Sequence, residues 1–229
     1  MEWLTATRAQ PAARTGNGEA DQAIEDARTL LRAADLASRP LRCADINDSA
    51  LAARDRHMAD AVAEALEAGP GGVALWAYNG HILKGRYAGG VPALGSHLAE
   101  RYGDAYYALG LLFGKGAFRA RRGNDAARPP VRHRISEGGP RSVEGQLAAA
   151  CPADHLVDLR PGKEIPEVNR WLTARHYTRS FGAGVPRFTY RFTLTPTVLA
   201  EEYDGLAYVA RSSCSRPLDL PAPDSQGSP

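Results

Sequence analysis

Apolar side chains recur at intervals of three and four along several stretches of the chain, a spacing typical of helices that pack against a core. The first stretch begins at Glu19 and ends before Pro40. A second follows Ser49, whose hydroxyl can cap a helix, and stops at Gly69. Similar patterns predict shorter helices at residues 94–101, 143–150 and 167–175 and another from Pro196 onwards.

Continuous apolar runs between these helices predict buried strands. The runs cover residues 73–77, 105–112, 155–159 and 205–210. Residues 188–194 alternate and predict an edge strand, whereas residues 117–137 are expected to form an exposed polar ribbon and linker. Strands that alternate with helices favour an α/β fold, with a mostly parallel or mixed central sheet flanked by helices. The aromatic residues expected in the core are Trp76, Trp171, Tyr106 and Tyr107.

Composition narrows the classes of function only slightly. The chain has 229 residues and a formal net charge of +2, which argues for neither nucleic acid nor an acidic membrane as a partner. Three widely spaced cysteines give no zinc pattern or disulfide framework, and they indicate reduced thiols in a cytoplasmic protein. We see no signal peptide and no run long enough to cross a membrane, and we expect residues 1–18 to be loose and residues 219–229 to be disordered.

Two short polar stretches are candidates for chemistry. The run at 73–77 leads directly into Tyr78, Asn79, Gly80 and His81, and ligands of α/β sheets sit beyond the carboxyl ends of strands. A histidine titrates near neutral pH and suits acid–base work, and the asparagine could hold a ligand oxygen. Both side chains could equally belong to an ordinary turn.

The second stretch is RDRHMAD, at the start of the predicted helix that follows Ser49. Arg54 could grip a substrate oxygen through its planar guanidinium group. The alternative is that Arg54 and Asp55 form a solvated first turn, because acidic groups stabilise helix N-termini in any case.

The order of several motifs resembles the erythromycin esterase family of hydrolases. The combination is specific, although no single motif is, and the similarity covers about residues 19–218, which we expect to form one partial domain. The matching segments are AIEDARTLLRAADLA (23–37), RDRHMADAVAEAL (54–66), VALWAYNGHILKG (73–85), LAERYGDAYYALGLLFGKGAFRA (98–120), HLVDLR (155–160) and EEYDGLAYVARSSCSRPL (201–218).

The resemblance implies hydrolysis of a carboxylic ester without metal or cofactor, in some members the lactone of a macrolide antibiotic. By resemblance, His81, Asn79 and Arg54 are the catalytic candidates. The candidates for substrate binding are Asp55, Tyr78 and Trp76.

The chain also departs from the family pattern. Tyr78 stands where the family's His-Asn-x-His motif has its first histidine, Ala61 where an asparagine is usual, and Lys115 where a glutamate is usual. The family's N-terminal Gly-Glu-x-x-His-Gly motif, which carries the general base, has no counterpart in residues 1–53. The chain thus resembles the C-terminal half of such an enzyme.

Three interpretations therefore stay open. The chain is an erythromycin-esterase-like hydrolase, truncated and either active or inactive. It is a binding module that holds a macrolide without cutting it. Or it is a subunit whose partner chain supplies the N-terminal half.

Overall fold

The coordinates come from a computed structural model and divide at Ala108 and Leu109 into two units, residues 1–108 and 109–229. The predicted domain at 19–218 spans both units. The described residues are 17–41, 43–87, 89–123, 125 and 127–217. The predicted tail at 219–229 and most of the predicted loose start lie outside them, while Asn17 and Gly18 already belong to a helix. No helix of the described part of the chain is long and apolar enough to span a membrane.

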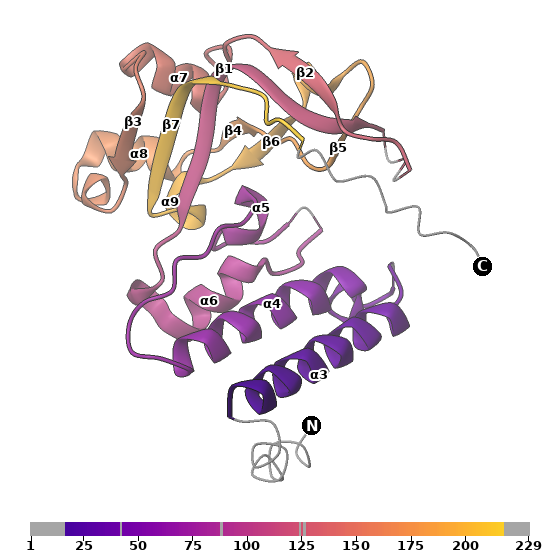
Figure 1. The fold of residues 1–229 in the computed structure, drawn as a ribbon. Helices are drawn as coiled ribbons and strands as arrows, with labels where there is room; N and C mark the ends of the chain where they lie inside the picture. Colours follow the sequence, from indigo (N-terminus) through magenta and orange to yellow (C-terminus); the bar gives the residue numbers. More distant parts are fainter. Residues whose placement is uncertain (1–16, 42, 88, 124, 126, 218–229) are drawn as a thin grey trace. The chain divides into compact units, whose positions relative to one another are not determined.

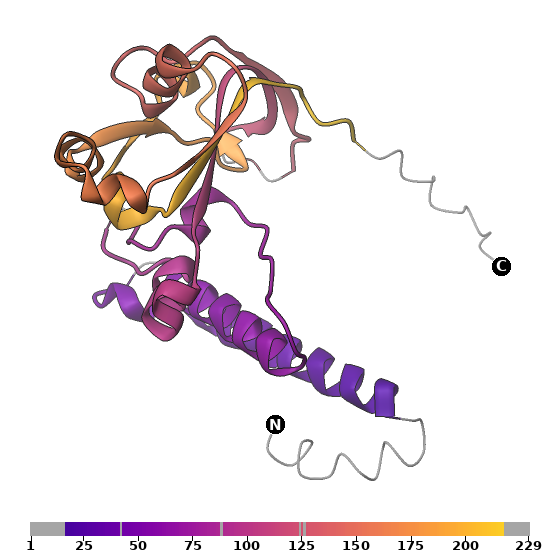
Figure 2. The ribbon, with the colours of Figure 1, turned by 90° about the vertical axis from the view of Figure 1, so that its left-hand side faces the viewer.

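The first unit is built from helices. Its elements are α3 (Asn17–Ser38), η1 (Ile46–Asp48), α4 (Ala50–Glu67), α5 (Asn79–Ile82), α6 (Leu94–Tyr102) and η2 (Gly103–Ala105). The two long helices α3 and α4 run side by side in both ribbon views (Figure 1 and Figure 2). The three-and-four spacing of the sequence predicted α3, α4 and α6, and these predictions are confirmed.

Helix α4 begins where the sequence predicts, because the Ser49 hydroxyl accepts a hydrogen bond from the Ala52 N–H at 3.2 Å. Its buried face consists mainly of alanines, and Ala59 packs against Leu94 and Leu98 of α6. Small side chains let the two helix backbones approach closely. A longer polar side chain on the same face, Asp55, is therefore enclosed at the contact between α4 and α6.

The predicted strand at residues 73–77 is wrong. The segment joins neither sheet of the described chain, and its side chains are exposed, Trp76 by 86%. Trp76 is consequently not a core residue, and Tyr107 is also 41% exposed. A continuous apolar run indicates a preference for burial, but a strand forms only where another strand offers its backbone N–H and C=O groups.

The second unit contains a mixed sheet. Its elements are β1 (Leu109–Arg122), β2 (Val131–Ile135), α7 (Val143–Ala150), β3 (His155–Asp158), η3 (Pro161–Glu164), α8 (Pro166–Thr173), β4 (His176–Arg179), β5 (Gly184–Val185), η4 (Tyr190–Phe192), β6 (Leu194–Thr197), α9 (Leu199–Glu202) and β7 (Gly205–Ser212). The sheet order is β2-β1-β7-β3, with β5 beside β1; β1 is parallel to β7 and β5 and antiparallel to β2 (Figure 1). The predicted α/β class with a mixed sheet is confirmed, as are α7, α8, β3 and β7.

Strand β1 differs most from its prediction, because it begins at Leu109 and continues to Arg122, through part of the predicted ribbon. Gly116 lies where β1 ends its pairing with β7 and begins its pairing with β2. Its φ of +131° and the Ser212 carbonyl oxygen, which a Cβ there would meet at 2.0 Å, both require glycine. Past this point Phe118 and Ala120 pack with Val185 and Tyr190, whereas Arg119 and Arg122 are exposed.

The region after β5 was also predicted incorrectly. Within the predicted edge strand at 188–194, Tyr190–Phe192 form the 3₁₀ turn η4, and the strand β6, paired with β4, begins only at Leu194. Pro196 lies inside β6 and does not open a helix; the short helix α9 begins at Leu199. Pro is tolerated at this position because β6 is an edge strand that pairs only with β4 among the described strands.

Candidate functional site

Helix α4 and the short helix α5 bring three of the predicted site residues together in the first unit. Arg54 and Asp55 lie in the second turn of α4, and His81 lies in α5. Asp55 has no exposed surface, whereas the side chains of Arg54 and His81 are 46% and 21% exposed. The alternative of a solvated first turn is thus wrong for Asp55, whose carboxylate points into the protein.

The Asp55 carboxylate accepts hydrogen bonds from four groups. Its Oδ2 receives the Tyr87 hydroxyl at 2.6 Å, the Leu94 backbone N–H at 3.0 Å and His81 Nδ1 at 3.2 Å. Its Oδ1 lies 3.4 Å from Nε of Arg54. Leu94 is the first residue of α6, so the carboxylate also lies at the positive end of that helix.

These donors decide the charge of Asp55. Burial alone would raise its pKa, but the hydrogen bonds from His81 and Tyr87, the charge of His81 and the N–H of Leu94 together hold the pKa below its usual range. For Tyr87, burial and the hydrogen bond to Asp55 raise the pKa of the hydroxyl. At neutral pH, Asp55 is therefore an anion and Tyr87 a neutral donor.

The tautomer of neutral His81 follows from this arrangement. An ionised carboxylate can only accept, so the single proton of the Tyr87 hydroxyl is donated to Asp55. The Tyr87 oxygen, 2.6 Å from His81 Nδ1, is then an acceptor for the Nδ1–H group. Neutral His81 is consequently held with its proton on Nδ1, and Nε2 keeps the lone pair that a base requires.

Arg54 lies beside that free nitrogen. Its Nη2 is 3.5 Å from Nε2 of His81, at the outer limit of a hydrogen bond, and about half of its side chain is exposed. Because its Nε contacts Asp55, the guanidinium group is held from one side and presents its Nη atoms next to the basic nitrogen. A cation in this place can stabilise negative charge that forms on a bound molecule.

The remaining predicted residues stand around α5. Tyr78 is the N-cap residue of the helix, and its ring meets the His81 ring edge-on, with the centroids 6.4 Å apart. Asn79 is the first residue of α5, two positions before His81. Trp76 lies in the exposed segment that leads into the helix. A Cβ at Gly80 would come within 2.8 Å of the Tyr78 ring, so a larger residue there would displace that ring.

Tyr87 is the residue that sequence reasoning missed. It lies in the loop that contains Gly85, Gly89 and Gly90 and connects α5 to α6. A tyrosine between glycines carries no pattern of its own, and its role depends on the return of this loop to α4. Of the other histidines, His57 binds Asp35 at 2.7 Å, and His133 is buried and contacts the Ala120 carbonyl at 3.1 Å.

Comparison with known proteins identifies the family of the chain. A family model described as erythromycin esterase matches residues 1–212. The chain belongs to the erythromycin esterase family. The match extends further toward the N-terminus than the motifs, which indicated similarity from about residue 19. The search among curated proteins gave no match.

Three solved structures resemble this member of the erythromycin esterase family. A succinoglycan biosynthesis protein matches with a TM-score of 0.70 and 20% identity over 91% of this chain and 49% of its own. A Bacillus cereus protein matches with a TM-score of 0.60 and 19% identity, over 71% of this chain and 39% of its own. A His-to-Asn mutant of the erythromycin esterase EreC, in its open conformation, matches with a TM-score of 0.54 and 20% identity. The match covers 75% of this chain and 40% of the mutant chain. Identities this low show the fold, and the chain spans at most about half the length of each protein.

Proposed function

We propose that the first unit carries an acid–base centre for hydrolysis of a carboxylic ester, with a macrolide lactone as the first substrate to test. The observation that supports this proposal most strongly is the double contact of His81 Nδ1 with Asp55 and Tyr87, which leaves Nε2 as the basic nitrogen. Family membership supports the reaction class.

In the proposed reaction, Nε2 of His81 removes a proton from a water molecule as the water oxygen attacks the ester carbonyl carbon. The bond from carbon to the attacking oxygen forms, and the carbonyl oxygen becomes an oxyanion. Arg54 donates to that oxygen, and Asn79 supplies a further donor from α5. The oxyanion then re-forms the carbonyl, and the bond from the carbonyl carbon to the ester oxygen breaks. The protonated imidazole, stabilised by the Asp55 carboxylate, gives its proton to the departing alkoxide, which yields an acid and an alcohol.

The test is to incubate the purified protein with erythromycin at neutral pH and to follow the mass of the drug for the gain of one water. His81→Ala should reduce hydrolysis by about 100- to 10,000-fold, the usual contribution of general acid–base catalysis. His97→Ala is the matched control, because this partly exposed histidine of α6 lies outside the cluster, and it should hydrolyse like the wild type. Hydrolysis at the wild-type rate in His81→Ala would remove the assignment.

A second candidate is a module that binds a macrolide without cutting it. It is favoured by the exposed aromatic side chains of Trp76 and Tyr78, 86% and 43% exposed, next to α5. Such rings suit an amphipathic ligand. Equilibrium binding of intact drug, lost in Trp76→Ser and without a ring-opened product, would support this candidate, and the absence of binding would end it.

A third candidate is a subunit that acts with a partner chain. The apolar segment 73–77 favours it, because this strand-like sequence has no partner strand among the described residues. The DNA that precedes the Met1 codon should then encode a Gly-Glu-x-x-His-Gly segment, in frame or as a separate gene. Co-expression of that segment should yield a stable complex, and unrelated upstream sequence would rule this candidate out.

A further inference from the structure

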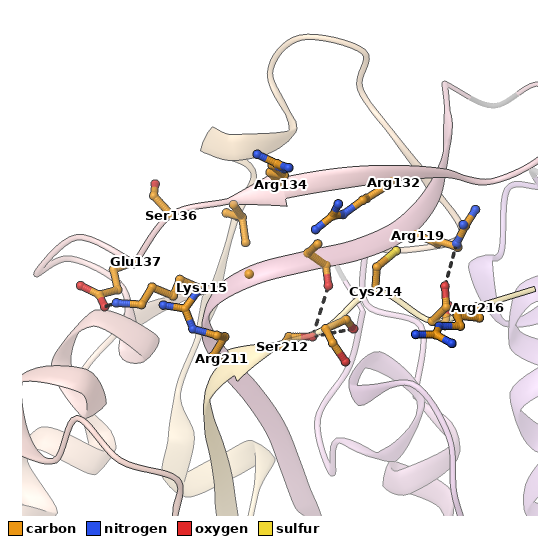
Figure 3. A pocket seen from close by; sticks show the side chains of 15 residues that line it. Lys115, Arg119, Arg132, Arg134, Ser136, Glu137, Arg211, Ser212, Cys214 and Arg216 are labelled. Carbon is orange, nitrogen blue, oxygen red and sulfur yellow. Dashed lines mark hydrogen bonds and ion pairs between the residues drawn. The ribbon is translucent and has the colours of Figure 1, made fainter.

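The second unit contains a basic groove that the proposed ester chemistry does not use. Its cavity volume is about 970 Å³, and it lies over β1, β2 and the segment that follows β7 (Figure 3). Six cationic side chains and one carboxylate, Glu137, line it. The cations are Lys115, Arg119, Arg132, Arg134, Arg211 and Arg216.

The charge is concentrated in this part of the chain. Residues 109–229 contain 17 Lys and Arg residues and 12 Asp and Glu residues. Residues 1–108 contain 11 Lys and Arg residues and 14 Asp and Glu residues. The net charge of +2 therefore hides a positive second unit, and six of its 17 cations line one groove.

Like charges face each other directly across the strands of this groove. Arg119 of β1 is paired in register with Arg132 of β2, and Arg134 is two positions along the same face. Like charges in such pairs destabilise a sheet. At the other end of the groove, Lys115 opposite Arg211 is relieved by its ion pair with Glu137, but no carboxylate lines the end with Arg119 and Arg132 (Figure 3).

Part of the groove is held in place before any ligand binds. The Arg119 guanidinium donates to the Ser215 carbonyl at 2.8 Å and to the Pro130 carbonyl at 3.2 Å, which fixes its orientation. Arg132 and Arg134 are exposed, and neither forms an ion pair with a described residue. Planar guanidinium groups in this arrangement match the oxygens of phosphate groups.

The lining also limits what the groove can hold. It contains no aromatic side chain on which a nucleobase could stack, and its apolar residues are Ala117 and Ile135. Ser212 and Ser213 add hydroxyl groups to the lining. The volume is that of a small-molecule site. From these observations we propose that the groove binds a small molecule that carries two or more phosphate groups.

The test is calorimetric titration of the full chain with sodium tripolyphosphate in a phosphate-free buffer of low ionic strength. The double variant Arg132→Gln/Arg134→Gln should raise the Kd by about tenfold or more, because each guanidinium removed takes charge-assisted hydrogen bonds with it. The matched control is Arg170→Gln/Arg175→Gln, which removes the same charge from exposed positions outside the groove and should leave the Kd nearly unchanged.

Thermal unfolding gives a second, independent measurement. Tripolyphosphate should raise the Tm of the wild type, and without ligand the groove variant should unfold at the wild-type Tm or above it, since it loses repulsion. No binding, or equal weakening in both double variants, would overturn the proposal. Citrate that binds as tightly as tripolyphosphate would overturn the assignment to phosphate. None of these outcomes depends on macrolide hydrolysis.

Discussion

Each unit contains a buried carboxylate that contacts an arginine, and the two are satisfied in different ways. In the first unit, four donors surround Asp55, and its pKa is lowered. In the second unit, Glu144 is 2% exposed, accepts the Arg179 backbone N–H at 2.8 Å through Oε1 and has no partner for Oε2. Burial dominates there, and the pKa of Glu144 is raised.

The donors around each carboxylate explain the difference in pKa, and the two arginines differ as well. The Arg54 guanidinium contacts its carboxylate and is half exposed, whereas that of Arg179 is buried and lies 3.8 Å from Glu144 through Nε. Arg179 donates instead to the backbone carbonyls of Phe113, Gly114 and Ser136, and so ties β4 to β1. Burial therefore does not identify a functional carboxylate. Asp55 orients a histidine that reaches solvent, while Glu144 and Arg179 form a structural brace.

The largest effect should come from breaking that brace. Arg179→Ala removes the side-chain donor to three carbonyls and the cation beside the buried Glu144, so we expect the free energy of unfolding to fall by about 3 to 5 kcal/mol. Urea unfolding measures the change. Arg187→Ala, at a position outside this network, serves as the control and should cost at most about 0.5 kcal/mol. A loss below about 1 kcal/mol in Arg179→Ala would show that the pair is not a brace.

Removal of the Asp55 carboxylate should lower the stability less than Arg179→Ala does and should lower the activity more. Asp55→Ala leaves the donors of Tyr87, His81 and Leu94 without their acceptor, and we expect a loss of about 2 to 3 kcal/mol in urea unfolding. Any esterase activity should disappear, because His81 then loses the group that orients it. Asp55→Asn keeps one acceptor oxygen and should lose less stability. Full activity in Asp55→Ala would separate this carboxylate from the site.

The site around Asp55 could be predicted from the sequence. The RDRHMAD and YNGH stretches indicated Arg54, Asp55 and His81, since polar residues beside apolar patterns are recognisable and the family motifs reinforced them. The brace was not predicted, because Glu144 and Arg179 are 35 positions apart and no local pattern links them. Tyr87 was missed for the same reason, as only the fold brings its loop to Asp55.

The predictions of secondary structure failed where pairing between strands decides the outcome. The spacing that predicts α4 is local, and its Ser49 cap is local too. Whether residues 73–77 form a strand depends on a distant partner, and the described chain offers none. In β1, buried and half-buried residues alternate only from Leu109 to Gly114; past Gly116 this pattern ends, and the arginines of residues 117–122 gave no strand pattern that the sequence alone could reveal.

A substitution with a smaller expected effect on stability tests whether Tyr87 acts in the candidate site or has only a structural role. Tyr87→Phe removes one hydroxyl that donates to Asp55 and accepts from His81, and we expect about 1 kcal/mol of lost stability in urea unfolding. The activity should fall more than the stability, because the Nδ1–H of His81 keeps only the longer contact with Asp55. Tyr102→Phe on α6 is a matched control within the same unit. Equal activity in the two variants would make Tyr87 a structural residue.

The smallest expected effect concerns the pH dependence of stability, to which Asp55 and Glu144 should contribute with opposite sign. The folded-state pKa of Asp55 lies below its unfolded value, so its contribution to stability is present above the unfolded pKa, near 3.9, and is lost as the pH falls through the folded pKa. For Glu144 the folded-state pKa lies above the unfolded value near 4.3, so the folded state binds more protons and stability falls as the pH rises through that interval. Urea unfolding of the wild type, Asp55→Asn and Glu144→Gln across acidic pH should therefore give difference curves of opposite slope. Slopes of the same sign would mean that the two buried carboxylates respond alike, and that the donors around Asp55 do not outweigh its burial.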